Sequence, residues 1–245
     1  LDLRVYHDGT DSFIKSDGTG DLYFQQANDD KDIVFQSDNG SGGITTYFFL
    51  DGSLANGTYT YTRWADNDVV AFGDSQDFLI YHDTSNTILY NSVGDIRITN
   101  AADDKDISFR CDDGSGGTTE YFRLDGSAAS SGTVYTIWPD NSIAAFGSDA
   151  DLRIEHTGST ASIFNTTGHL QIINYADDSD ILFKSDDGSG GVTTYFKLDG
   201  SLATHDGSTT TTMYTKWSDN SIISLGDSND ARLYHNGTDT YLDNL

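Results

Sequence analysis

Closely spaced aspartates recur three times in this sequence, and their pattern is the one that most directly suggests chemistry. Each group reads Asp-Asp-x-Asp. Carboxylates gathered in one turn, together with backbone carbonyls, can supply the six to eight oxygens that Ca²⁺ prefers. The spacing matches neither the EF-hand loop nor the Gly-Gly-x-Gly-x-Asp nonapeptide. Two hypotheses follow, a Ca²⁺ site and a solvated turn that keeps the protein soluble. The candidate ligands are Asp29, Asp30, Asp32, Asp103, Asp104, Asp106, Asp177, Asp178 and Asp180.

Four histidines stand at equivalent positions, each at the end of an alternating segment such as Leu3-Arg-Val-Tyr-His. Side chains of a strand alternate between its faces, so each histidine shares a face with apolar residues. They could meet around a threefold axis and hold a metal or an anion. They could instead lie in a fibre interior, neutral and hydrogen-bonded, and this second arrangement is the one we expect. The interior histidines are His7, His82, His156 and His235, whereas His169 and His205 lack counterparts and are predicted at the surface.

Three tryptophans, Trp64, Trp138 and Trp217, also occupy equivalent positions. Their rings could serve as stacking platforms for a glycan, or they could cover the junction between two strands. The strand-junction role is the simpler expectation.

No pattern in the sequence indicates catalysis. The Gly-Ser-Gly-Gly stretches lack the Gly-Lys-Ser/Thr signature of a phosphate loop and lie between two strands, so they are predicted to be turns. Glycoside cleavage needs two carboxylates at a fixed separation, but with 37 aspartates chance pairs abound, and Glu120 and Glu155 each occur in one copy only. We therefore expect no enzymatic activity.

The elements that would position these residues are repeated at a step of about 74 residues. Phe48, Phe122 and Phe196 show this step, as does the near-identical stretch around each Gly-Ser-Gly-Gly. A fixed period predicts a stack of like units rather than one globular core. The chain opens and closes inside the motif, so we expect it to be a piece of something longer. The predicted copies are residues 1–75, 76–149, 150–228 (with a loop insertion near 204–212) and a truncated start at 229–245.

Composition predicts an all-β protein. The acid is almost entirely Asp, which favours turns, while the 25 glycines, the single proline and the many aromatic residues are typical of short strands and tight turns. Each copy should contain paired short strands, including one at Leu22 and Phe24, at Ile96 and Ile98, and at Leu170 and Ile172.

The net charge of −26 excludes several partners. Nucleic acid and anionic membranes require clustered cations, and the longest apolar runs are too short to span a bilayer. Cys111 is the only cysteine, so it cannot form an internal disulfide. Because each strand carries only two or three inward apolar residues, stability must come from packing against other units. An intertwined homotrimer would supply that burial.

Segments such as Asp2–Gly9, Asp77–Asp83, Asp151–Gly158 and Asp230–Gly237, followed by the acidic and Gly-rich turns, resemble repeats in tail-fibre and virion structural proteins of marine tailed phages. The likeness covers essentially the whole chain. It implies a trimeric, elongated β fibre that carries a host-recognition tip, and it supplies no catalytic residues.

These observations predict a structural, non-enzymatic segment of a tail fibre, located in the virion and acting outside the host cell. Its expected partners are two further copies of itself, other tail proteins, and a host glycan or protein bound through a tip outside this segment. Two alternatives remain open. One is a polysaccharide-degrading tailspike, and the other is a secreted Ca²⁺-dependent bacterial adhesin.

Overall fold

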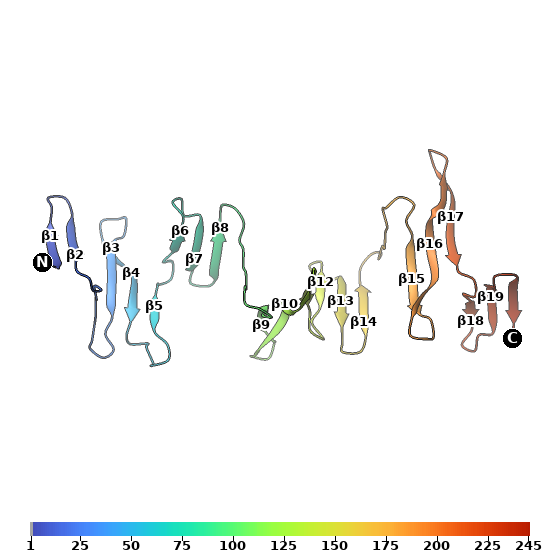
Figure 1. The fold of residues 1–245 in the computed structure, drawn as a ribbon, viewed down its shortest axis with the longest axis horizontal. Helices are drawn as coiled ribbons and strands as arrows, with labels where there is room; N and C mark the ends of the chain where they lie inside the picture. Colours follow the sequence, from blue (N-terminus) through green and yellow to red (C-terminus); the bar gives the residue numbers. More distant parts are fainter. Residues whose placement is uncertain (1) are drawn as a thin grey trace. The chain divides into compact units, whose positions relative to one another are not determined.

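The computed structural model describes residues 2–245, which form β-strands joined by turns and contain no helix. The all-β prediction is confirmed. Every strand pairing is antiparallel, and each sheet is built from strands that follow one another along the chain (Figure 1). No helix capable of crossing a membrane occurs in this described range.

Two kinds of three-stranded sheet alternate along the chain. The first kind, here named the ladder sheets, follows each acidic turn; its strands are β3 (Ile33–Asp38), β4 (Ile44–Asp51) and β5 (Tyr61–Arg63), then β9 (Ile107–Asp112), β10 (Thr118–Ser130) and β11 (Thr133–Ile137), then β15 (Ile181–Asp186), β16 (Val192–His205) and β17 (Thr210–Trp217).

The second kind, named the histidine sheets, carries the repeated histidine on its central strand. Its strands are β6 (Val70–Phe72), β7 (Phe78–His82) and β8 (Thr87–Asn91), then β12 (Ala144–Phe146), β13 (Leu152–His156) and β14 (Ala161–Asn165), then β18 (Ile223–Leu225), β19 (Ala231–His235) and β20 (Thr240–Asn244); β1 (Leu3–His7) and β2 (Ser12–Ser16) form a two-stranded counterpart.

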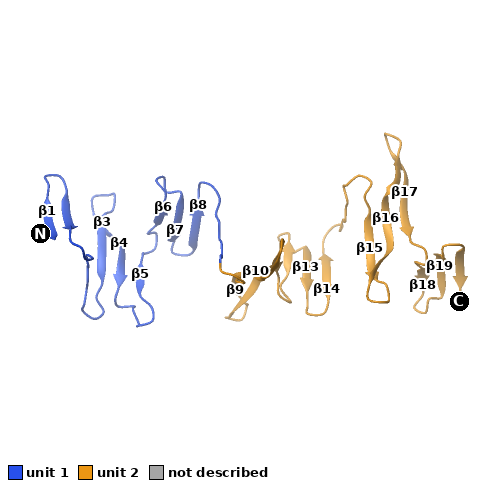
Figure 2. Ribbon diagram, viewed as in Figure 1, with its two compact units in different colours: residues 1–101 blue, residues 102–245 orange. Residues whose placement is uncertain are grey.

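The sheets do not coincide with the copies predicted from the sequence. Each predicted boundary falls inside a histidine sheet, in the turn between its first and second strands, as between β6 and β7. Contacts group the chain into two compact units, and the division falls in the sequence between Ala101 and Ala102 (Figure 2). Among the described strands, contacts occur only between strands of the same sheet.

The ladder sheets share an irregularity that the alternation does not reveal. Phe35 lies opposite Phe48 and Gln36 lies opposite Thr46, so Tyr47 is an extra residue that forms a β-bulge. The Tyr47 hydroxyl donates a hydrogen bond of 2.8 Å to the carbonyl of Asp38. The same bond recurs at Tyr121 and Tyr195, so it fixes the Gly-rich turn in every copy.

The third strand predicted in each copy is absent. Residues 21–25, 95–99 and 169–173 belong to no strand or sheet, and their apolar side chains are exposed. Alternation such as that of Ile96 with Ile98 indicates a strand, but no strand of the described chain is paired with these segments.

In the single chain, the face that carries the histidine is exposed on the three-stranded histidine sheets, as Ile154 and His156 of β13 show. That this face lines the interior of an assembly stays a prediction. The other face of β13, with Arg153 and Glu155, is partly covered. Arg153 lies across the neighbouring aromatic ring of Phe164 at 5.2 Å.

The chain has almost no interior of its own. No described apolar residue is buried, and the only buried residues are three equivalent aspartates, Asp51, Asp125 and Asp199. The chain exposes 19346 Å² of surface. A compact monomer of its 26.7 kDa would expose about 10,700 Å². Each chain therefore exposes about 8,600 Å² more surface than a compact monomer of the same mass.

Each buried aspartate is the centre of a hydrogen-bonded group that we name the Asp clasp. One oxygen of Asp125 accepts bonds from the Ser127 hydroxyl and the Ala128 amide, both at 2.8 Å, and the other accepts from Arg123 at 2.7 Å. These partners lower the pKa of Asp125 to about 2, the Ala128 amide contributing most. Asp51 and Asp199 are held in the same way, by Arg63 and Lys197 respectively.

The clasp also fastens the acidic turn to the ladder sheet. The amide of Gly126 donates to Asp106 at 2.9 Å, and the equivalent bonds join Gly52 to Asp32 and Gly200 to Asp180. The turn approaches so closely that a Cβ on Gly126 would lie 2.4 Å from the Lys105 carbonyl oxygen. Glycine is therefore required here by close backbone approach.

We expect Gly126→Ala to destabilise the folded protein by about 1–3 kcal/mol, because the backbone of the acidic turn must move away. Gly20→Ala is the matched control, since its Cβ would meet nothing within 4 Å, and it should change stability by less than about 0.5 kcal/mol. Denaturant unfolding of both variants measures the difference. Equal stability of the two variants would contradict the fastening role of the clasp.

The clasp also predicts a pH dependence. The pKa of Asp125 and of Asp199 is lowered to about 2 in the folded chain, whereas an unfolded aspartate titrates near about 3.9. A group with a lowered folded pKa stabilises the fold above its unfolded pKa, and this stabilisation is lost as the pH falls through the folded pKa. The melting temperature should therefore fall between about pH 4 and pH 2. The double variant Asp125→Asn, Asp199→Asn should show a shallower fall, and an unchanged slope would refute this origin.

Candidate functional site

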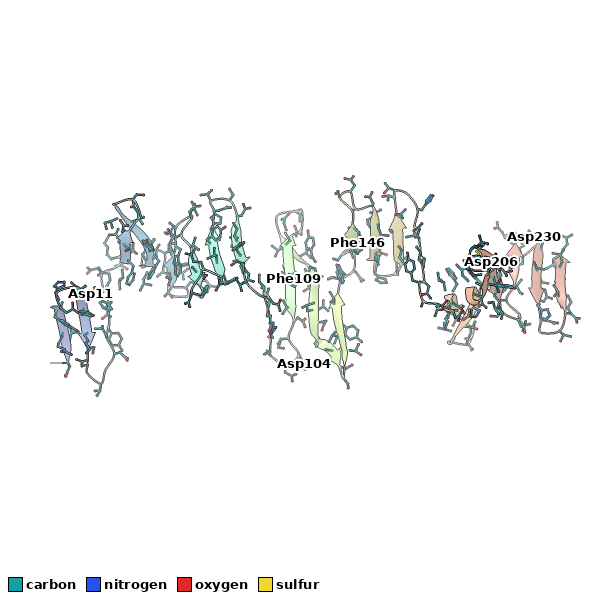
Figure 3. All side chains as sticks on the ribbon, turned by 90° about the horizontal axis from the view of Figure 1, so that it is seen from above. Asp11, Asp104, Phe109, Phe146, Asp206 and Asp230 are labelled. Atoms are coloured by element: carbon teal, nitrogen blue, oxygen red, sulfur yellow. The ribbon has the colours of Figure 1, made fainter. Side chains whose placement is uncertain are left out.

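The acidic turns place their aspartates in two different environments. Asp104 lies at the turn that precedes β9 (Figure 3) and has a φ of 55°, a left-handed conformation that Asp tolerates better than most residues. Its counterparts Asp30 and Asp178 have φ angles of 57° and 54°. The third aspartate of each turn instead accepts the glycine amide of the Asp clasp.

This arrangement bears on the Ca²⁺ hypothesis. Asp106 and Asp180 also face the clasp cations Arg123, at 3.5 Å, and Lys197, at 2.7 Å. Within residues 2–245, no three His, Cys, Asp or Glu side chains gather closely enough to hold a metal ion. The turn-forming role of these residues is therefore visible in the structure, and Ca²⁺ binding stays a prediction.

Three of the four repeated histidines form a bridge between consecutive sheets. Nδ1 of His156 lies 2.7 Å from Asp140, and the amide of Asn141 donates to the carbonyl of His156 at 2.8 Å. Asp140 belongs to the turn that follows Trp138, so these bonds join the end of a ladder sheet to the next histidine sheet. The same bridge joins His82 to Asp66 and His235 to Asp219, at 2.9 and 3.2 Å.

His7 differs, because its Nδ1 lies 3.3 Å from the Ser12 hydroxyl. All four side chains are exposed in the single chain, as are His169 and His205. The expectation that the four histidines line an interior concerns an assembly of several chains, and it stays a prediction.

The tryptophans end a row of stacked rings on each ladder sheet. Phe109, Phe122 and Trp138 come from successive segments, and their ring centroids are 4.5 and 5.6 Å apart. The other two ladder sheets have the same row with nearly the same spacing. Trp138 therefore packs on the ring of Phe122, which belongs to the middle strand β10. About two-fifths of the Trp138 surface stays exposed.

An open groove lies beside each of the first two tryptophan turns. In the second copy it has a volume of about 470 Å³ and is lined by Tyr121, Asp140 and Asn141, among others. Its counterpart in the first copy measures about 380 Å³ and includes Tyr47, Trp64 and Asn67. Aromatic rings beside amide and carboxylate groups are suitable for a glycan. The glycan hypothesis for Trp64, Trp138 and Trp217 therefore stays a prediction, with Trp64 lining its groove directly.

The residues that sequence reasoning missed are Asp51, Asp125 and Asp199, together with the aspartate two positions after each tryptophan. One signal could have found the first group. Each buried aspartate belongs to an Asp-Gly-Ser sequence. The cation that forms the ion pair with it lies on different strands in different copies, as Arg63 on β5 and Arg123 on β10 show.

Truncation of a ladder tryptophan should destabilise the folded protein. We expect Trp138→Ala to reduce the free energy of unfolding by about 1–2 kcal/mol, because stacked aromatic pairs contribute about 0.5–1.5 kcal/mol beyond the area they bury. Trp138→Phe keeps a ring on Phe122 and should cost less than half as much. Denaturant unfolding compares the two variants, and an equal loss would show that stacking is not what the tryptophan contributes.

Comparison with known proteins adds no relative. No family model matches the chain, no curated protein is significantly similar to it, and no solved structure matches its fold.

Proposed function

We propose that this chain is a structural, non-enzymatic segment of a phage tail fibre. It acts in the virion, outside the host cell, as an elongated homotrimer that extends and presents a host-receptor-binding tip. The tip belongs to a part of the fibre beyond this segment. The observation that carries the proposal is the absence of any buried apolar residue among residues 2–245, with about 8,600 Å² of surface left to cover.

The excess of exposed surface favours an obligate assembly over a monomer that binds its partner transiently. Obligate interfaces bury about 2,000–5,000 Å² or more in total, whereas transient ones bury less. Exposed apolar residues occur on all ladder and histidine sheets, from Leu3 to Leu242. An assembly that covers them must therefore run along the whole chain, as the intertwined chains of a fibre do.

The repeat period favours copies of the same chain as partners. Identical chains placed in register bring equivalent apolar rows together at every repeat. A partner protein with a different repeat length, or with no repeat, could not match these rows along the whole chain. The number of three rests on the resemblance to tail-fibre repeats. A threefold arrangement also presents three copies of any tip, and multivalent binding raises the effective affinity for a host surface.

The placement of the charged residues supports a structural role rather than an enzymatic one. The buried carboxylates are each held by a cation and by amide or hydroxyl donors. The histidines that have a carboxylate partner use it to join two sheets. Most remaining acids are exposed in turns, where a net charge of −26 keeps a long assembly soluble.

The oligomeric state tests this proposal. Light scattering on the purified chain should give three times the 26.7 kDa chain mass, and the assembly should resist denaturation, because its burial is shared between chains. Electron microscopy should show a particle that becomes shorter by about one repeat when residues 76–149 are deleted. A folded, stable monomer with the strand content of the full chain would refute the proposal.

A further inference from the structure

Three equivalent segments have the apolar alternation of a strand but belong to no sheet of the described chain. They are residues 21–25, 95–99 and 169–173, and each follows a histidine-type sheet. None of these residues takes part in a backbone-to-backbone hydrogen bond with residues 2–245. An extended backbone with free amides and carbonyls is a template on which another strand can pair.

The second segment has the alternation of a half-buried strand, and the other two have the same apolar pair with one further apolar residue on the opposite face, Tyr23 and Ile173. Ile96 and Ile98 share one face and are 56% and 67% exposed, while Asp95 and Arg97 lie on the other face. The equivalent apolar pairs in the other two segments are also exposed; they are Leu22 and Phe24, and Leu170 and Ile172. Apolar side chains in a strand-like pattern that are exposed within the chain indicate that another molecule packs against them.

An apolar groove accompanies the segment. In the first copy a groove of about 390 Å³ is lined by Phe24 and Gln25 of the segment and by Ile33, Leu50 and Tyr61 of the ladder sheet. In the third copy a groove of about 420 Å³ at the same place on the ladder sheet is lined by Ile181 and Leu198 and by Asn174, which directly follows the segment, but by no residue of 169–173. Unpaired backbone beside an apolar groove is the arrangement by which an added strand binds.

We propose that residues 21–25, 95–99 and 169–173 are intermolecular strands, each of which pairs through its backbone with a strand of a second copy of this chain. The inference rests on the proposed assembly and names the segments that form it. The three segments recur at the same step of 74 residues. Two copies in register therefore meet at all three together, and a second copy is the partner that has this period.

Hydrogen exchange on the assembled protein tests the pairing. The amides of residues 95–99 should exchange at least 100-fold more slowly than those of an unstructured peptide, approaching the rates of β10. The oligomeric state is measured first, by light scattering. A trimer whose segments exchange like free peptide overturns this inference alone, whereas a monomer overturns both it and the proposed function.

A cross-linking experiment distinguishes pairing between chains from a hairpin within one chain. A photoreactive phenylalanine replaces Arg97, and unlabelled chains are refolded together with ¹⁵N-labelled chains. Cross-linked peptides that join a light to a heavy chain are expected. Cross-links confined to one chain would overturn the proposal.

Matched substitutions on the two faces of the segment give a third test. Ile98→Asn places an amide in the predicted interface, while Thr99→Asn changes the opposite face. The first should lower the melting temperature of the assembly by several degrees and the second should leave it unchanged. Equal effects would contradict a buried row at Ile96 and Ile98, and hydrogen exchange on the parent decides the question if Ile98→Asn does not assemble.

Discussion

The structure depends on one constraint, which is that a single-layer antiparallel sheet satisfies its backbone but covers neither of its faces. A net hydrogen bond contributes about 0.5–1.5 kcal/mol, whereas ordering one residue costs about 1–2 kcal/mol of backbone entropy. The ladder and histidine sheets therefore cannot be stable through their own hydrogen bonds. Within the chain, the stacked row of two phenylalanines and a tryptophan is the main apolar contact of each ladder sheet, and it leaves the ring surfaces partly exposed. In the proposed assembly, other chains would cover most of the apolar surface that remains exposed.

The Asp clasp shows how strictly a buried charge is controlled in an otherwise exposed protein. A carboxylate that is removed from water requires a cation and hydrogen-bond donors, and each copy meets this requirement once. Phe49 lies opposite Arg63 in the first ladder sheet, and Arg123 lies opposite Ile137 in the second. Between the first and second copies the arginine and the apolar residue opposite it have exchanged strands, and the buried aspartate still pairs with the arginine. In the third copy Lys197 lies opposite Lys216, and Lys197 makes the contact. The copies differ in sequence at the clasp but retain the interaction, as they retain the tyrosine hydrogen bond and the aromatic stack.

The sequence predicts this fold well where a local pattern determines the structure. It predicts the fold poorly where the structure depends on a residue or strand that is distant in the sequence. Composition indicates an all-β chain, and the Gly-Ser-Gly-Gly stretches mark turns, because both signals depend on near neighbours in the sequence. The burial of Asp125 could not be predicted, since it depends on a turn that begins some 20 residues earlier and folds back against Gly126. The bridge between His156 and Asp140 spans 16 residues for the same reason. The third strand that alternation predicts at Ile96 and Ile98 is absent, because alternation indicates one apolar face but does not indicate which strand pairs with it.

These features give the chain two kinds of junction in alternation. From a ladder sheet to the next histidine sheet, the turn after the tryptophan is fastened by a side-chain contact between aspartate and histidine and by a backbone bond, as Asn141 to His156 shows. From a histidine sheet to the next ladder sheet, the chain passes through a segment that makes no backbone-to-backbone hydrogen bond with residues 2–245, as at residues 169–173. Directly after it, the side chain of Asn174 donates a hydrogen bond to the carbonyl of Asp180 in the acidic turn. In the proposed assembly, pairing of these segments with another copy would add backbone hydrogen bonds to the second kind of junction, so the contact that buries the apolar rows would also join successive repeats.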